Sequence, residues 1–111
     1  MTKGDQRKGG KARSHYPLEQ VRSLVSSGRY LITYNAQAYA YTFFGWKIKD
    51  IESALLKLEP KHFHKSEISR CDGKTWIDYY KALDLMGENV YIHFHVDEEQ
   101  NRLILASCKR I

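Results

Sequence analysis

The chain has 111 residues, of which 42% are hydrophobic and 13% aromatic, and it carries a net charge of +5 at pH 7. This length fits one compact domain, and no apolar run reaches the roughly 18 residues that a membrane helix needs. Five of the 18 basic residues but only one of the 13 acidic residues lie in residues 1–14, so the rest of the chain carries just +1. Any polyanion site on the body must therefore come from local clustering of charge.

Residues 1–14 are rich in glycine, lysine and arginine and almost free of apolar side chains. Because such a segment buries too little surface to order itself, we expect a disordered basic tail followed by a single domain over residues 15–111. The tail acts either as a solvating arm or as a non-specific contact for RNA or DNA. It lacks the apolar stretch of a secretory signal, and the widely spaced Cys71 and Cys108 do not indicate a disulfide framework. These features predict a reduced, cytoplasmic setting with no membrane contact.

The first half of the chain shows helical spacing of apolar residues. A helix is predicted from Pro17 to Gly28, followed by a short strand over residues 29–34. Asn35 is the expected N-cap of a second helix, which Gly45 would end. The expected inner stripe of that helix comprises Ala36, Tyr39, Ala40 and Phe43. A third helix is predicted over residues 48–58, where Pro60 prevents continuation. The dense aromatic residues 39–46 fit either core packing or a contact surface for a partner protein.

After Pro60 the period changes to the alternation of β-strands. Four strands are predicted, over residues 62–69, 75–81, 89–96 and 102–109. Asp72-Gly73 indicates a two-residue hairpin between the first two. In the third strand Val90, Ile92, Phe94 and Val96 should face the core, with Tyr91, His93 and His95 on the other face. The sequence therefore predicts an α+β domain, with three N-terminal helices and one short strand packed on one face of a mainly antiparallel C-terminal sheet.

Four short motifs in these strands resemble those of the MqsR family of bacterial type II toxins. They are Phe63-His64-Lys65-Ser66, Trp76-Ile77-Asp78-Tyr79-Tyr80, Tyr91-Ile92-His93 and Ser107-Cys108-Lys109. The family has Phe-Tyr-Lys-Ser, Trp-Gln-Asp-Val-Tyr, Tyr-x-Lys and Ser-Phe-Lys at the corresponding places. The resemblance covers residues 16–109 and implies a RelE-like toxin that cuts single-stranded mRNA without a metal or cofactor. It also implies a cognate antitoxin, expected to carry a helix-turn-helix DNA-binding domain.

The resemblance and the chemistry of RNA cleavage select the candidate site residues. Lys65 and Tyr91 match the family's active-site lysine and tyrosine, whereas Ile77 replaces its glutamine. Cleavage needs a base, an acid and cations beside the phosphate, and it would leave a 2′,3′-cyclic phosphate and a 5′-hydroxyl. The candidate catalytic residues are Lys65, Tyr91, Glu67, His64 and His93, and the candidate RNA-binding residues are Arg70, Lys109 and Trp76.

Each candidate also has a structural reading. Lys65 and Glu67 would also fit an ordinary ion pair on a solvent-exposed sheet face. Tyr91 would fit a half-buried strand tyrosine, and Trp76 would fit a core residue. Asp78 would orient a lysine or histidine, or else accept a structural hydrogen bond. The pairs His62/His64 and His93/His95 would bind zinc only if they faced each other. Because the glutamine is lost, the alternative function is that of a non-catalytic relative that binds RNA or antitoxin. A third possibility is an interaction protein that uses the aromatic helix surface.

Overall fold

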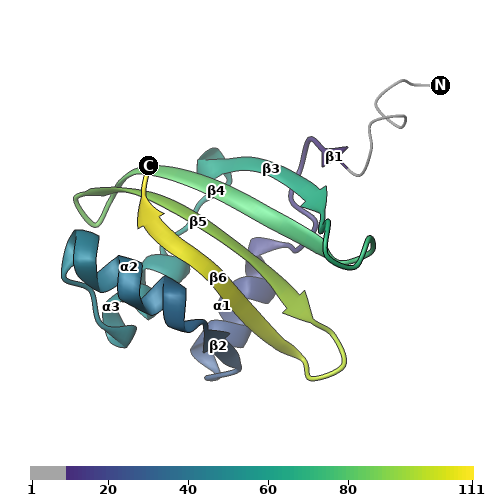
Figure 1. The fold of residues 1–111 in the computed structure, drawn as a ribbon, viewed down its shortest axis with the longest axis horizontal. Helices are drawn as coiled ribbons and strands as arrows, with labels where there is room; N and C mark the ends of the chain where they lie inside the picture. The colour runs from purple at the N-terminus through teal and green to yellow at the C-terminus, as the bar shows by residue number, and fades with distance from the viewer. Residues whose placement is uncertain (1–9) are drawn as a thin grey trace.

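The computed structural model of the protein describes residues 10–111. Its helices and strands follow one another along the chain (Figure 1) as β1 (Gly10–Lys11), α1 (Leu18–Ser26), β2 (Tyr30–Ile32), α2 (Tyr34–Phe44), α3 (Ile48–Leu56), the 3-10 helix η2 (Pro60–His62), β3 (Phe63–Ile68), β4 (Trp76–Leu85), β5 (Glu88–Asp97) and β6 (Arg102–Arg110).

Within the described residues, the strands form a six-stranded sheet in the order β1-β3-β4-β5-β6-β2. The pairings are antiparallel except that of β2 with β6, which is parallel. Helices α1, α2 and α3 lie together on one face of the sheet, and the other face is open (Figure 1). The α+β architecture predicted from the sequence is confirmed.

The core lies between the helices and the inner face of β4, β5 and β6. Val90, Ile92, Phe94 and Val96 of β5 are all buried, as the alternation predicts, while Tyr91, His93 and His95 are half-buried on the open face. Helix α1 contributes Val21, Leu24 and Val25 to the same core. Alternation along the central part of β4 and along β5 therefore places the residues between these buried side chains on the open face.

Helix α2 begins two residues earlier than predicted, because Thr33 and not Asn35 is its N-cap. The backbone N–H of Thr33 still donates to Leu105 O of β6 (3.0 Å), and its hydroxyl accepts from Ala36 N (3.2 Å). Thr33 therefore ends the strand and caps the helix at once. The predicted inner stripe is correct for Ala36 and Ala40, but Tyr39 is 46% exposed.

Two other features differ from the sequence prediction. The loop after β3 is wider than a two-residue hairpin, since pairing stops at Ile68 and Trp76. Asp72 opens a turn of its own there, where its carboxylate accepts from the N–H groups of Lys74 and Thr75 (2.9 Å each). Helix α3 ends at Leu56, not Leu58.

The predicted disordered tail over residues 1–14 lies mostly outside the described part of the chain. Its first nine residues lie outside the described part of the chain, but Gly10 and Lys11 form β1 and pair with Glu67 and Ser66 of β3. Composition predicts how much apolar surface a segment buries, whereas β1 is ordered by backbone hydrogen bonds at an open sheet edge. Among residues 10–111, no helix is long and apolar enough to cross a membrane.

Candidate active site on the open sheet face

Three adjacent strands bring Lys65, Tyr79 and His93 into one row. Lys65 of β3 pairs with Tyr79 of β4, and Tyr79 pairs in turn with His93 of β5. Neighbouring strands lie about 4.8 Å apart, so side chains in such a row are in contact range. The row is on the face of the sheet that the helices leave open.

The ammonium group of Lys65 is held between a carboxylate and an aromatic ring. Its Nζ lies 3.2 Å from Glu67 Oε2 and 4.9 Å from the centroid of the Tyr79 ring. The two charged side chains are 41% and 46% exposed. Both therefore remain accessible to a ligand on the open face.

Tyr91 lies beside this row, between two lysines. It pairs with Lys81 of β4 and Lys109 of β6, and Lys109 Nζ lies 5.8 Å from the centroid of its ring. The ring centroids of Tyr91 and Tyr79 are 6.2 Å apart. Burial raises the pKa of Tyr91, and the nearby Tyr79 and Glu67 raise it further. The phenol of Tyr91 consequently stays protonated at neutral pH and can donate a hydrogen bond.

His93 packs against both tyrosines. Its ring centroid lies 4.9 Å from that of Tyr79 and 6.0 Å from that of Tyr91. Its Nδ1 is buried and has no hydrogen-bond partner among the described residues. Burial lowers the pKa of His93, and Lys109 and His95 lower it further. The imidazole is therefore neutral at pH 7, the form that accepts a proton.

Lys65, Lys81 and Lys109 give the open face a local excess of positive charge, opposed by Glu67. This excess is the clustering that a near-neutral body needs if it is to hold a phosphate. His64 occupies a bulge of β3, where the register shifts between Phe63 and Lys65, and it is exposed. Burial and the charges of Lys81 and Lys65 lower its pKa. His64 thus borders the same cationic region.

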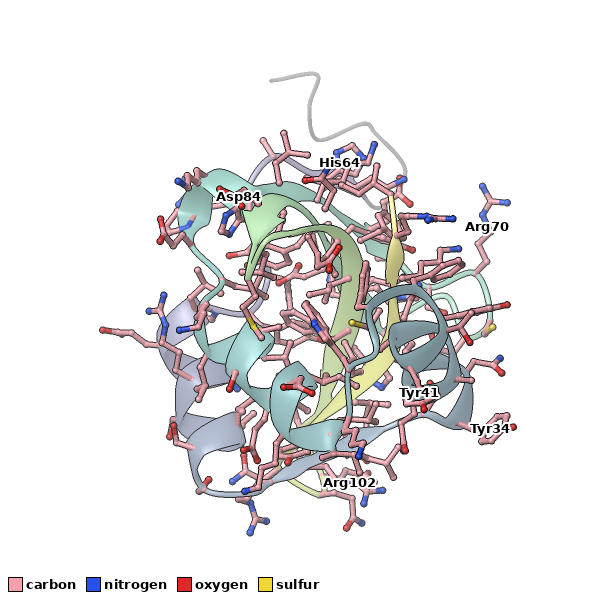
Figure 2. All side chains as sticks on the ribbon, turned by 90° about the vertical axis from the view of Figure 1, so that its left-hand side faces the viewer. Tyr34, Tyr41, His64, Arg70, Asp84 and Arg102 are labelled. Atoms are coloured by element: carbon pink, nitrogen blue, oxygen red, sulfur yellow. The ribbon has the colours of Figure 1, made fainter. Side chains whose placement is uncertain are left out.

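Two predicted RNA-binding residues lie apart from this cluster. Arg70 is exposed in the loop between β3 and β4 and extends away from the body of the domain (Figure 2). Trp76 packs against the core from the helix side of β4, and its ring stacks on that of His15 with centroids 5.2 Å apart. The structure thus supports the core reading of Trp76.

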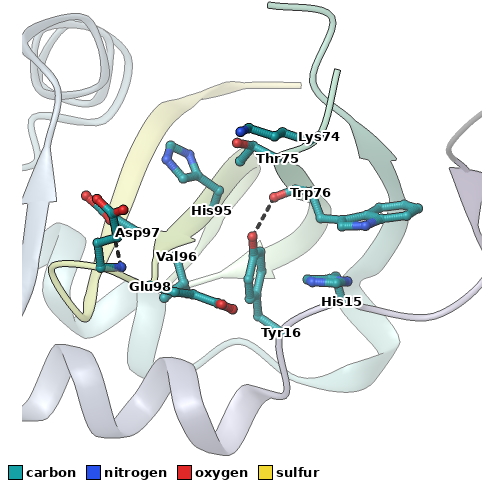
Figure 3. Close-up of a pocket in the computed structure, with 10 residues that line it drawn as sticks. His15, Tyr16, Lys74, Thr75, Trp76, His95, Val96, Asp97 and Glu98 are labelled. Atoms are coloured by element: carbon teal, nitrogen blue, oxygen red, sulfur yellow. Dashed lines mark hydrogen bonds between the residues drawn. The ribbon is translucent and has the colours of Figure 1, made fainter. Parts of the chain in front are cut away.

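Asp78 makes structural hydrogen bonds, which is one of the two roles predicted for it from the sequence. Its buried carboxylate accepts from the backbone N–H groups of His15 and Tyr16, at 2.9 Å each. The hydroxyl of Tyr16 donates to the carbonyl oxygen of Trp76 (2.8 Å; Figure 3). These bonds fix the segment that precedes α1 against β4.

A cavity of about 520 Å³ lies beside this anchor (Figure 3). Its rim carries Asp97, Glu98 and Glu99, with Lys74 as the opposing cation. Carboxylates repel a phosphate backbone, so the cavity is electrostatically unsuited to RNA. The lysine-bearing open face, although it is not a deep pocket, is the better candidate for an RNA site.

The position of the family's glutamine is filled by a hydrocarbon. Ile77 is half-buried and pairs directly with Glu67 across β3 and β4. His62, one of the histidines considered as zinc ligands, has another role. It is buried, and its Nδ1 accepts a hydrogen bond from Glu59 N (3.0 Å). Within residues 10–111, no group of three or more His, Cys, Asp or Glu side chains is arranged to hold a metal ion.

Tyr79 is the central residue of the cluster, and it is not among the site residues predicted from the sequence. It contacts the rings of Tyr91 and His93 and the ammonium of Lys65. The signal was present in the alternation of β4, where Tyr79 and Lys81 face opposite to the buried Asp78 and Tyr80.

The fold is an α+β domain whose helices cover one sheet face, and whose other face carries lysines, tyrosines and a histidine. The family described as "Motility quorum-sensing regulator, toxin of MqsA" matches residues 13–110. The chain belongs to this MqsR toxin family, and with it to the toxins of toxin–antitoxin systems. No curated protein sequence gives a significant match.

Proposed function

We propose that the chain is a metal-independent endoribonuclease that cuts single-stranded mRNA on the open sheet face. The observation that carries the proposal is the gathering of Lys65 and Tyr91 around Tyr79, from three different strands. The lysine offers a positive charge for the phosphate, and the tyrosine offers a protonated phenol. Both side chains are at positions that match the active-site motifs of the family.

The proposed reaction is an internal transfer of the phosphate. A base takes the proton of the ribose 2′-hydroxyl, O2′ bonds to phosphorus, and the bond from phosphorus to O5′ breaks. Glu67 and the neutral His93 are the candidate bases, and His64 is a third proton carrier at the edge. Tyr91 donates a proton to the departing O5′ and is reprotonated from solvent. The products are a 2′,3′-cyclic phosphate and a 5′-hydroxyl.

The cations on the open face stabilise the transition state. Lys65 lies nearest the candidate base Glu67, and Lys109 lies beside Tyr91, so the two ammonium groups flank the proposed position of the phosphate. Charge placed in advance where negative charge develops is commonly the largest contribution to such catalysis. The half-buried rings of Tyr91 and His93 offer surfaces for unpaired bases, which is how single-stranded RNA is usually read.

The proposed partner is a cognate antitoxin that holds the toxin inactive. The family description names its members as toxins of MqsA, and an antitoxin of this kind would carry a helix-turn-helix DNA-binding domain. We expect such an antitoxin to be encoded beside the gene of this chain. The proposed setting is the cytoplasm, where mRNA is the accessible substrate.

Cleavage of a defined single-stranded RNA by purified protein tests the proposal. We expect Lys65→Ala and Tyr91→Phe to lower the cleavage rate by about 100-fold each, the scale of losing one catalytic contact. The matched controls are Lys61→Ala and Tyr34→Phe, since both residues are exposed and lie outside the cluster. Equal activity of all four variants would overturn the proposed site.

Ile77 favours one alternative function. A side chain with no hydrogen-bonding group occupies the place of the family's glutamine, beside Glu67. In the alternative, the chain binds RNA or antitoxin without cutting RNA. Wild-type protein that binds the RNA, leaves it intact and does not arrest growth when expressed would establish the alternative.

A further inference from the structure

Tyr79 lies within one of the motifs that connect this chain with its family, but it departs from the family's residue there. The family motif Trp-Gln-Asp-Val-Tyr has valine where this chain has Tyr79. In the structure, Tyr79 is nevertheless the residue that joins Lys65 of β3 to His93 and Tyr91 of β5. An aromatic residue in place of valine therefore changes what surrounds the ammonium group of Lys65.

We propose that Tyr79 is a positioning residue, whose ring face holds the Lys65 ammonium where it meets the scissile phosphate. This inference rests on the proposed endoribonuclease function. The relevant contact is between Lys65 Nζ and the Tyr79 ring, 4.9 Å from the centroid, a separation at which a cation is attracted to the face of an aromatic ring.

Lys65 needs such a support because its ion pair alone holds it weakly. A lysine side chain is a flexible stem of four carbons, and an exposed ion pair restricts its rotation little. Both Lys65 and Glu67 are more than 40% exposed, so water competes for their contact. The Tyr79 ring on the neighbouring strand excludes rotamers of Lys65 that the Glu67 carboxylate alone would allow.

Tyr79 is itself held in place by its neighbours. The His93 ring lies 4.9 Å from it and the Tyr91 ring 6.2 Å from it, both from the rigid strand β5. The contacts with β5 thus hold the Tyr79 ring in place, and the ring in turn restricts the flexible Lys65 on β3. The contact uses the ring and not the hydroxyl, so phenylalanine should replace Tyr79 and valine should not.

The first test compares cleavage rates of Tyr79→Phe and Tyr79→Val. We expect the phenylalanine variant to cut within about two-fold of wild type, and the valine variant to lose roughly ten-fold. In a Lys65→Ala background, Tyr79→Val should cause no further loss, because the group that it positions is gone. Tyr34→Val, at a residue that is 82% exposed, controls for loss of a tyrosine elsewhere.

The second test reads the contact directly by NMR and does not depend on RNA cleavage. The ε-methylene protons of Lys65 should be shifted upfield by the ring in wild type and in Tyr79→Phe, and should move toward the values of a free lysine in Tyr79→Val. Circular dichroism of each variant checks that the domain remains folded.

The outcomes separate the two proposals. Unshifted Lys65 protons in the wild-type protein, or equal cleavage losses for phenylalanine and valine, would overturn the positioning role of the ring. Losses that multiply in the double variant would do the same, since they show independent effects. If wild-type protein cuts no RNA, the proposed function is overturned, and the NMR shifts alone decide whether the ring holds the lysine.

Discussion

Glu67 and Ile77 face each other across strands β3 and β4 of the open sheet face. A carboxylate that also binds Lys65 thus has a hydrocarbon as its direct cross-strand neighbour. A glutamine at this position, as in the family motif, would place an amide opposite Glu67 on the face where RNA is proposed to bind. The side chain of Ile77 consequently cannot make the hydrogen bonds to base edges that an amide could make.

Ile77→Gln should restore that hydrogen-bonding capacity and change which RNA sequences are cut. A site that bonds a base edge discriminates between bases, whereas a hydrocarbon discriminates little. Mapping of the cut sites in a mixed-sequence RNA would measure the change. Ile77→Leu is the control, because it alters shape without adding an amide. Identical cut sites for wild type, leucine and glutamine variants would show that position 77 does not contact the bases.

Glu67→Gln separates a catalytic base from a surface ion pair. If Glu67 takes the 2′-hydroxyl proton, the variant should lose at least about 100-fold in cleavage rate, since an amide cannot accept the proton. Its stability should change by less than about 1 kcal/mol, because the partners are exposed and screened. The control is Glu59→Gln, which removes an exposed partner of Lys61 (3.9 Å) outside the cluster. Unchanged cleavage by Glu67→Gln would leave His93 as the base.

The buried and half-buried histidines should make the protein less stable as the pH falls below neutrality. The pKa of His93 is lowered by burial and by the charges of Lys109 and His95. The unfolded chain binds a proton near the ordinary pKa of about 6.5, while the folded protein does not. The stabilising contribution is therefore complete above pH 6.5 and is lost as the pH falls from there toward the lowered pKa. His62 and His95, whose pKa values burial also lowers, act in the same direction.

Urea unfolding at pH 7.5 and at pH 5.5 would measure this loss. We expect His93→Gln to reduce the pH dependence of the unfolding free energy, because glutamine does not titrate. His64→Gln, at an exposed residue, should reduce it less. A steeper acid loss in His93→Gln than in wild type would show that His93 is charged in the folded protein.

The sequence determined the fold where one physical rule decided the outcome. Strict alternation in β5 was enough to assign Val90, Ile92, Phe94 and Val96 to the core. The start of α2 needed more information, because Thr33 and Asn35 are both good caps. The bond from Thr33 N to Leu105 O, formed with a strand 72 positions later, holds Thr33 extended directly after β2 and so makes it the cap. Strand β1 likewise depends on a sheet edge that does not exist in the local sequence.

The candidate site was predictable to the extent that it follows strand alternation and motif positions. Lys65, Glu67, Tyr91 and His93 do lie on one face, as the register of β3, β4 and β5 shows. The place of Tyr79 in the site could not be predicted from the motifs, because Tyr79 departs from the family's residue at that position. Trp76 belongs to a motif but alternates with Ile77, so its ring faces the helix side. The register that joins β3, β4 and β5 is a tertiary property, and it alone shows which residues meet.

Asp78→Asn should destabilise the domain without changing the open face. The carboxylate of Asp78 accepts from His15 N and Tyr16 N, and both of its oxygens are used. An asparagine offers one oxygen and turns an N–H group toward the second donor, which leaves a buried polar group unsatisfied. We expect a loss of about 2 kcal/mol in the free energy of unfolding, measured in urea, and faster hydrogen exchange at the amides of residues 15 and 16. The control is Asp84→Asn, because Asp84 is exposed and its φ of 57° is one that asparagine tolerates. Equal stability of the two variants would show that the segment before α1 is held by packing alone.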